Sequence, residues 1–280
     1  MAAEASSAEP GPGPGPGTAP ADSVARRELR LFLTAVQFFT RVPVPAWVGH
    51  SAAQLDGSSR YFPAVGLCVG LYAAATYAVA AALWNAPVAA LLATAVTALV
   101  TGGFHEDGLA DTVDGLGGAM SRKRALEIMK DSRVGTFGVL ALLLVIALKV
   151  AALAAAPLVA AVAALPAAHS SSRWLAASLI WRSRYVRLDD SSRAKPVTRS
   201  LTTGGFAYST LWMLPALFAC AWLAPLAALV AMLAAGAMRL WLRRWFERRL
   251  GGYTGDALGA TQQLTELAFY LGWLAAWPWS

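Results

Sequence analysis

The chain has 280 residues, of which 57% are hydrophobic and only 14% are charged, and its mean hydropathy is +0.51. A soluble domain of this length needs far more polar surface to cover its core, so composition excludes a soluble fold. The formal net charge is +7, but the basic residues stand in clusters between apolar stretches. That arrangement indicates membrane topology and anionic ligands, and no nucleic-acid partner is expected.

The first 22 residues are a Gly/Pro-rich tail in which glycine and proline alternate from Gly11 to Gly17. Such a low-complexity segment is expected to be disordered, and it lacks the basic and apolar regions of a signal peptide. The apolar stretch from Leu29 to Phe39 is too short to cross a bilayer. Its arginine neighbours predict a helix that lies in the membrane interface.

Long apolar stretches then fill the rest of the chain, and each is close to the roughly 20 residues that a membrane-spanning helix needs. Residues 23–280 are therefore predicted to form one all-α domain, a polytopic integral membrane helix bundle with an N-terminal interfacial helix. Seven crossings are expected, or six if 225–242 or the last stretch does not cross fully. The stretches are 62–84, 87–104, 135–156, 158–181, 206–224, 225–242 and 262–279.

The loops between these stretches alternate between short uncharged turns and long basic segments. The turns lie near Asn85, Pro157 and Pro225, and the basic loops are 105–134, 182–205 and 239–261. Because cytoplasmic loops carry the excess of Lys and Arg, the basic loops and the N-terminus are predicted to be cytoplasmic. The expected location is the bacterial cytoplasmic (inner) membrane, with the turns and the C-terminus facing outward.

An acidic motif opens the first basic loop. Asp107, Asp111 and Asp114 are spaced i, i+4 and i+7, which places three carboxylates on one face of a helix. Like charges at that spacing repel, so a cation is expected among them. Carboxylates are the hard ligands of Mg²⁺, which completes its coordination with substrate phosphates. His105 and Glu106 add a candidate proton acceptor and a further ligand. The alternative, a solvated acidic loop that balances arginines, is disfavoured by the helical register.

Residues 122–133 predict an amphipathic cytoplasmic helix beside this motif. Its cations, Arg122, Lys130 and Arg133 among them, are suited to phosphate oxygens, and Asp131 is suited to a metal. The alternative left open is a helix held by internal ion pairs and anchored on lipid headgroups.

Ionisable residues also occur inside the predicted spans, where they are costly and face a cavity or a partner. Arg173 and Lys149 are such residues, and we expect a functional or pairing role for both. Asp256 stands in a glycine-rich segment before the last span and is either a ligand or a helix cap.

The motifs at these positions resemble those of the cobalamin synthase family, the adenosylcobinamide-GDP ribazoletransferases. The resemblance runs in the family's order from about residue 30 to the end of the chain. The string His105-Glu106-Asp107-Gly108-Leu109-Ala110-Asp111-Thr112-Val113-Asp114-Gly115 followed by Glu127-Ile128-Met129-Lys130-Asp131-Ser132-Arg133 is its most specific part. The other matching segments are 38–45, 61–66, 101–104, 134–138, 251–260 and Glu266. The segment Asp189 to Ala194 departs from the glycine-rich stretch expected there.

The resemblance implies a Mg²⁺-dependent transferase that joins α-ribazole, or its 5′-phosphate, to adenosylcobinamide-GDP with release of GMP. With the residue patterns it gives three sets of candidates. The catalytic set is His105, Asp111 and Lys130, the substrate-binding set is Arg122, Arg133, Arg173 and Asp256, and the metal set is Glu106, Asp107, Asp111, Asp114 and Asp131. A homo-oligomer is compatible with the sequence. Two rival hypotheses are another membrane transferase acting on pyrophosphates, of the CDP-alcohol phosphotransferase or prenyltransferase type, and a transporter.

Overall fold

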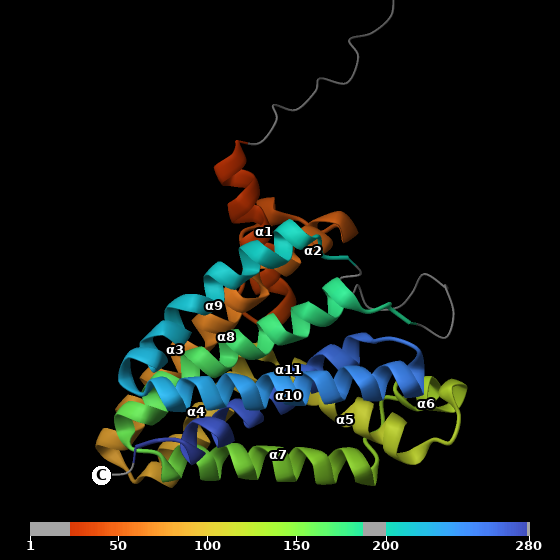
Figure 1. Cartoon of the computed structure of the whole chain (residues 1–280). Helices are drawn as coiled ribbons and strands as arrows, with labels where there is room; N and C mark the ends of the chain where they lie inside the picture. The colour runs from red at the N-terminus through yellow and green to blue at the C-terminus, as the bar shows by residue number, and fades with distance from the viewer. Residues whose placement is uncertain (1–22, 187–199, 279–280) are drawn as a thin grey trace, which may run out of the picture.

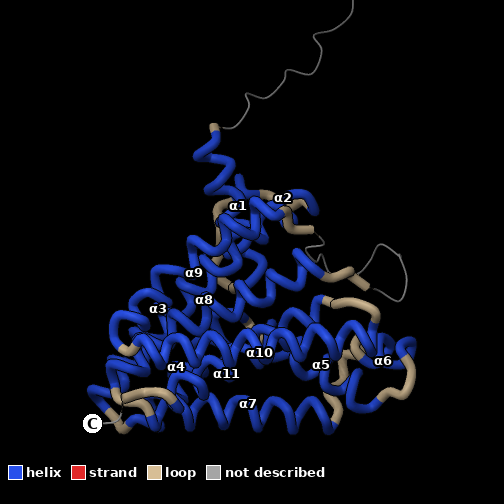
Figure 2. The backbone as a smooth tube through the Cα atoms, in the orientation of Figure 1, coloured by secondary structure: helices blue, strands red, loops and turns tan. Residues whose placement is uncertain are grey.

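The computed structural model describes residues 23–186 and 200–278, and within these ranges the named elements are all helices (Figures 1 and 2). The Gly/Pro-rich tail and the segment Asp189 to Ala194 lie outside the described residues. A single parallel bridge between Tyr185 and Tyr253 is the one β-type pairing in the described part. The all-α prediction is thus confirmed.

All seven predicted spans are helices, with some shifted ends. They are α3 (Phe62–Leu83), α4 (Ala86–Thr101), α7 (Thr136–Ala155), α8 (Leu158–Arg182), α9 (Thr203–Leu223), α10 (Pro225–Leu250) and α11 (Gly255–Ala275). The turns α3–α4, α7–α8 and α9–α10 gather with the end of α11 at one end of the bundle, at lower left in Figure 1. The far side carries α1 (Val24–Phe39), α2 (Ala52–Ser58) and α6 (Arg122–Ile128).

By length and composition, four helical segments are apolar enough to cross a membrane. They are 52–83, α7, α9 and α10, and the bent pair of α4 and α5 (Phe104–Gly118) makes a fifth if it counts as one span. The protein is therefore a multi-pass membrane protein by composition. Helices α8 and α11 are not among the four, although both are as long as the others.

The reason lies in the position of α8 and α11 at the centre of the bundle. Most residues of both helices are buried by neighbouring helices, whereas α7, α9 and α10 leave most of their surface open. A helix that meets protein on all sides can carry polar groups, because its neighbours and not lipid must satisfy them. The polar residues of α8 and α11 therefore indicate a central position.

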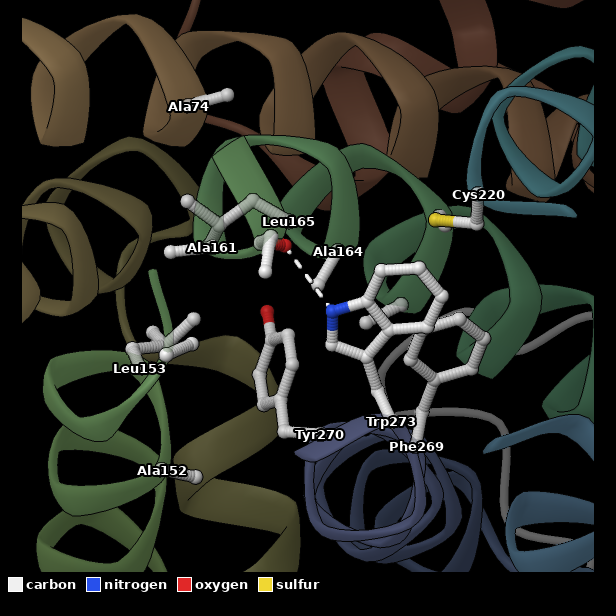
Figure 3. Packing of buried hydrophobic residues seen from close by; sticks show 14 of the residues in the cluster. Ala74, Ala152, Leu153, Ala161, Ala164, Leu165, Cys220, Phe269, Tyr270 and Trp273 are labelled. Carbon is white, nitrogen blue, oxygen red and sulfur yellow. Dashed lines mark hydrogen bonds between the residues drawn. The ribbon is translucent and has the colours of Figure 1, made fainter. Parts of the chain in front are cut away.

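Small residues let the helices approach closely, as is usual in membrane bundles. A side chain at Gly70 of α3 would lie 2.5 Å from the Cα of Pro166 in α8, so only glycine fits that crossing. Figure 3 shows the apolar packing between α8 and α11, where the indole of Trp273 donates a hydrogen bond of 3.1 Å to the carbonyl of Ala160. The ring is thus buried among apolar side chains, while its N–H group keeps a hydrogen-bond partner.

Helix α1 confirms the helix predicted at Leu29 to Phe39. It buries one face through Leu31, Ala35 and Phe39, and Ser23 caps it by accepting a hydrogen bond from the Arg26 amide. Glu28 on the helix joins it to Arg60 and to the Tyr61 hydroxyl. These contacts attach α1 to the residues immediately before α3.

Candidate active site

The chain turns sharply at the two glycines that separate α4 from α5. Gly102 and Gly103 have φ angles of +69° and +70°, a left-handed conformation that favours glycine, and the two helix axes differ by 90°. The Gly103 amide closes the end of α4 by donating to the Ala98 carbonyl at 2.8 Å. The span predicted at 87–104 therefore ends at Thr101, and the acidic motif leaves it as a separate helix.

The acidic face of α5 borders an open groove of about 500 Å³. Exposed Asp107 and Arg41 line it, together with Val134 and the α7 residue Leu142. Asp111 lies one turn further along the same face of α5 and is partly exposed. A carboxylate pair beside an arginine, open to solvent, is suited to a phosphate group together with a cation. Arg41 was not among the predicted site residues.

Asp114, the third aspartate of the motif, has a different position. It is 8% exposed, and its two carboxylate oxygens each accept a hydrogen bond of 2.8 Å, from the amides of Gly135 and Gly138. These amides belong to the start of α7, so Asp114 satisfies the N-terminal donors of that helix and its positive end. A helix-capping role thus accounts for this side chain.

His105 and Glu106 lie on another side of α5, away from the aspartates. A separation of two residues corresponds to about 200° around a helix, so His105 points away from Asp107. The His105 ring is buried and stacks on Phe39, with 5.2 Å between centroids. Glu106 accepts a hydrogen bond of 3.0 Å from the Gln263 amide. The structure therefore does not bring these two residues together with Asp107 and Asp111.

The helix predicted over residues 122–133 ends at Ile128, so the prediction was wrong for its second half. In the following turn Arg133 binds Asp131 through two guanidinium nitrogens, at 3.0 and 2.7 Å. The hydrogen bond from Arg133 lowers the pKa of Asp131 to about 2, which keeps this carboxylate ionised at neutral pH. Arg122, Lys130 and Arg133 are all exposed, as a surface that meets an anionic substrate requires.

Asp256 lies in the first turn of α11, which begins at Gly255 and not near residue 262. The cap of this helix is Thr254, whose hydroxyl accepts from the Ala257 amide at 3.1 Å, so Asp256 is not the capping residue. The backbone of Asp256 packs against Gly108 of α5, where a side chain would meet the Asp256 carbonyl at 2.9 Å. The structure thus places the start of α11 directly beside the acidic helix.

A buried polar network lies deeper, between α5, α7, α8 and α11. Lys149 pairs with Glu266 at 2.8 Å and donates to Gln263 at 2.6 Å, and the His169 ring lies 3.2 Å from Glu266. Arg173 donates to the carbonyl of His169 at 3.1 Å. This confirms the pairing role expected for Lys149, and it places Arg173 in the interior, away from the open groove.

The network includes two glutamines that the sequence analysis did not single out. Gln262 and Gln263 are buried in α11 and hydrogen-bond to Glu266 and Glu106 respectively. The available signal was the spacing of Gln262 and Glu266, which puts two polar groups on one face of a helix predicted to cross the membrane.

The carboxylates of α5 fit a Mg²⁺ ion that takes its remaining ligands from water and substrate phosphates. Within residues 23–186 and 200–278, no three His, Cys, Asp or Glu side chains converge to hold a metal by themselves. Mg²⁺ is commonly held by one or two carboxylates with water and substrate phosphates, and Asp107 with Asp111 supplies two. The groove therefore fits a cation that arrives with a phosphate-bearing substrate.

Comparisons with known proteins show the family of this chain. Residues 31–274 match the family described as Cobalamin-5-phosphate synthase. A protein of Leptothrix cholodnii named adenosylcobinamide-GDP ribazoletransferase is 48% identical over 253 residues, which are 89% of this chain and 96% of the relative. A protein of the same name from Shewanella amazonensis is 47% identical over 262 residues, which are 92% of this chain and 100% of the relative. No solved structure gives a significant match. The chain belongs to the cobalamin-5-phosphate synthase family.

Proposed function

We propose that this chain is an adenosylcobinamide-GDP ribazoletransferase of the cytoplasmic membrane. A ribose hydroxyl of α-ribazole, or of its 5′-phosphate, attacks the phosphorus on the cobinamide side of the pyrophosphate. The new P–O bond forms as the bond to GMP breaks, and the hydroxyl proton leaves. The observation that carries the proposal is the match of residues 31–274 to one family, in a fold where the acidic helix borders an open groove.

The residues of the groove would share the work of binding and neutralisation. Asp107 and Asp111 would hold Mg²⁺ against the pyrophosphate, and Arg41, which lines the same groove as Asp107, would bind its oxygens. The metal, when bound, supplies positive charge that stabilises the charge developing on the phosphoryl oxygens. Arg133 and Lys130, exposed after α6, would neutralise the departing GMP.

The remaining candidates have separate roles. Asp131 holds Arg133 in a two-nitrogen contact, so its proposed part is to orient that cation and only secondarily to bind metal. Asp114 fixes the start of α7 against α5. His105, on the interior side, remains the proposed proton acceptor for the attacking hydroxyl. Of the substrate-binding set, Arg122 is suited to solvent-exposed phosphate and Arg173 to an interior part of a substrate.

The test is GMP release by purified protein with adenosylcobinamide-GDP, α-ribazole and Mg²⁺. Asp111→Asn removes a charge from the acidic face of α5, one turn from Asp107, and we expect activity to fall by at least about a hundredfold with unchanged membrane insertion. Glu247→Gln is the matched control, because it removes an exposed carboxylate that pairs with Arg243 on α10, and its activity should stay unchanged. Turnover of Asp111→Asn at the wild-type rate would remove the metal assignment.

The same assay distinguishes the proposed function from the rival transferase hypotheses. A CDP-alcohol phosphotransferase would release CMP from a CDP-alcohol and no GMP from adenosylcobinamide-GDP. The sequence motif of the CDP-alcohol phosphotransferases requires Asp-Gly-x-x-Ala-Arg, whereas this chain has Asp107-Gly108-Leu109-Ala110-Asp111. A transporter hypothesis leaves the carboxylates of the open groove without a role.

A further inference from the structure

A second cavity, of about 190 Å³, lies between α4 and the central helices, and it is partly open, since Leu91 and Ala95 in its lining are exposed. One wall is α4, with threonines and alanines, and the other walls are the polar side chains of α5, α7, α8 and α11. Its lining includes Ala98 and Thr101 of α4, His105 and Glu106 of α5, Arg173 of α8 and Gln262 of α11. The space is that of about six water molecules, which is also enough for a sugar ring.

Four polar atoms on the lining residues are buried and, in the described part of the chain, have no hydrogen-bond partner. They are Nε2 of His105, Oε2 of Glu106, Nε of Arg173 and Oε1 of Gln262. His105, Arg173 and Gln262 are at most 3% exposed. A buried polar atom without a partner is costly, so a bound group is expected to satisfy these atoms.

These atoms match hydroxyl groups better than an anion. Glu106 and Gln262 offer acceptors, Arg173 offers a donor, and His105 offers either according to its tautomer. A hydroxyl both donates and accepts, and two neighbouring hydroxyls satisfy such a mixed set. A phosphate only accepts when ionised, and it would meet the carboxylate of Glu106, while Lys149 is already paired with Glu266.

An aromatic cavity adjoins this polar one and shares His105, Arg173 and Gln262 with it. Its lining includes Phe38, Phe39, Phe62 and Phe104, and its volume is about 30 Å³. This space is that of about one water molecule, so the aromatic side chains form an apolar border to the polar cavity and leave no room for a further ring.

The interior cavity also adjoins the open acidic groove, because Thr101 lines both. Thr101 is the last residue of α4, immediately before the glycine turn. A hydroxyl held in the interior cavity would therefore approach the groove across the α4–α5 corner, from the side opposite the solvent.

From these contacts we propose that the interior cavity binds the ribosyl hydroxyls of the riboside substrate, α-ribazole, while the pyrophosphate donor occupies the acidic groove. The inference rests on the proposed function. It assigns Arg173, Gln262 and Glu106 to the hydroxyl groups of the nucleoside. The two substrates then meet at the corner formed by Thr101 and His105.

The test fills the cavity without touching its polar atoms. Ala98→Phe on α4 projects a ring into the space, and Leu99→Phe, at a position 67% exposed on the outside of the same helix, is the matched control. Overpacking should raise the KM for α-ribazole by about tenfold or more and leave the KM for adenosylcobinamide-GDP unchanged. Leu99→Phe should change neither KM. If Ala98→Phe does not fold, the smaller Ala98→Val replaces it.

Equilibrium dialysis of α-ribazole against the same proteins, without the donor, gives an independent reading. Binding that is present in the wild type and in Leu99→Phe, and weakened about tenfold in Ala98→Phe, supports the subsite. Unchanged α-ribazole affinity and KM in Ala98→Phe would mean that the cavity holds water only, and would overturn the inference. Absence of GMP release from the wild type would instead contradict the proposed function, so the two failures are distinguishable.

Discussion

Three aspartates on one predicted helix face, at positions i, i+4 and i+7, have two different environments in this protein. Asp107 lines the groove with Asp111 one turn further along the same face, whereas Asp114 is buried against the first amides of α7. The difference comes from Gly135 and Gly138, more than twenty residues further along the chain. Spacing within the motif predicts one shared face but contains no information about that distant contact. This is why the sequence predicted the acidic face and could not separate a capping carboxylate from exposed ones.

Substitution of Asp114 should therefore affect stability more than chemistry. Asp114→Asn keeps one acceptor and turns an amide N–H₂ toward a backbone N–H, so one buried donor loses its partner. A loss of about 2 kcal/mol is expected, or a fall in Tm of roughly 5 °C. The measurement is thermal unfolding of the detergent-solubilised protein.

Asp111→Asn is the comparison for that experiment, since it should lower activity with little change in Tm. If Asp114→Asn unfolds at the wild-type temperature and loses activity as completely as Asp111→Asn, the capping role is wrong and Asp114 belongs with the metal ligands.

At the level of elements, the apolar pattern predicted each spanning helix but not each boundary. Helix α11 begins at Gly255, seven residues before the predicted start, because its first turns contain polar residues that pack against α5 and α8 and not lipid. The 90° turn at Gly102 and Gly103 was missed for a different reason, since an apolar run before a glycine pair is also compatible with a straight helix. Burial by neighbours decides the first case, and the left-handed conformation of the two glycines decides the second.

The crossing of α5 and α11 gives a prediction at this scale. A side chain at Gly108 would lie 2.9 Å from the Asp256 carbonyl and 3.2 Å from the Cα of Gly259. Gly108→Ala must therefore move α5 away from α11 and displace Asp107 in the groove. The expected result is a loss of kcat on the order of tenfold or more in the GMP assay.

Gly118→Ala is the control on the same helix, because nothing lies within 4 Å of a side chain added there. It should retain wild-type activity, since alanine is favoured over glycine in a helix. Equal activity of the two variants would show that the close approach at Gly108 does not position the acidic face.

At the scale of the whole molecule, apolar helices form the outer layer of the bundle, and α8 and α11, which carry buried polar residues, form its centre. Lys149 and Glu266, on α7 and α11, form the buried ion pair that joins the outer layer to the centre. Sequence analysis singled out both residues but not their partnership, since pairing depends on how helices far apart in the chain pack. Removal of one partner of such a pair leaves an uncompensated charge in a low-dielectric interior.

The arrangement of helix ends predicts a topology that fusions can test. The three short turns and the end of α11 lie together, away from α1 and α6, and the exposed arginines at 122, 124 and 133 lie on the α6 side. By the positive-inside rule we expect that side to be cytoplasmic. Alkaline phosphatase inserted at Asn85 or fused to the C-terminus should then be active, because both sites are expected to face the periplasm. Green fluorescent protein at the N-terminus should fluoresce. A fluorescent C-terminal fusion would mean an even number of crossings, and one of α3, α4, α7–α11 would then not cross.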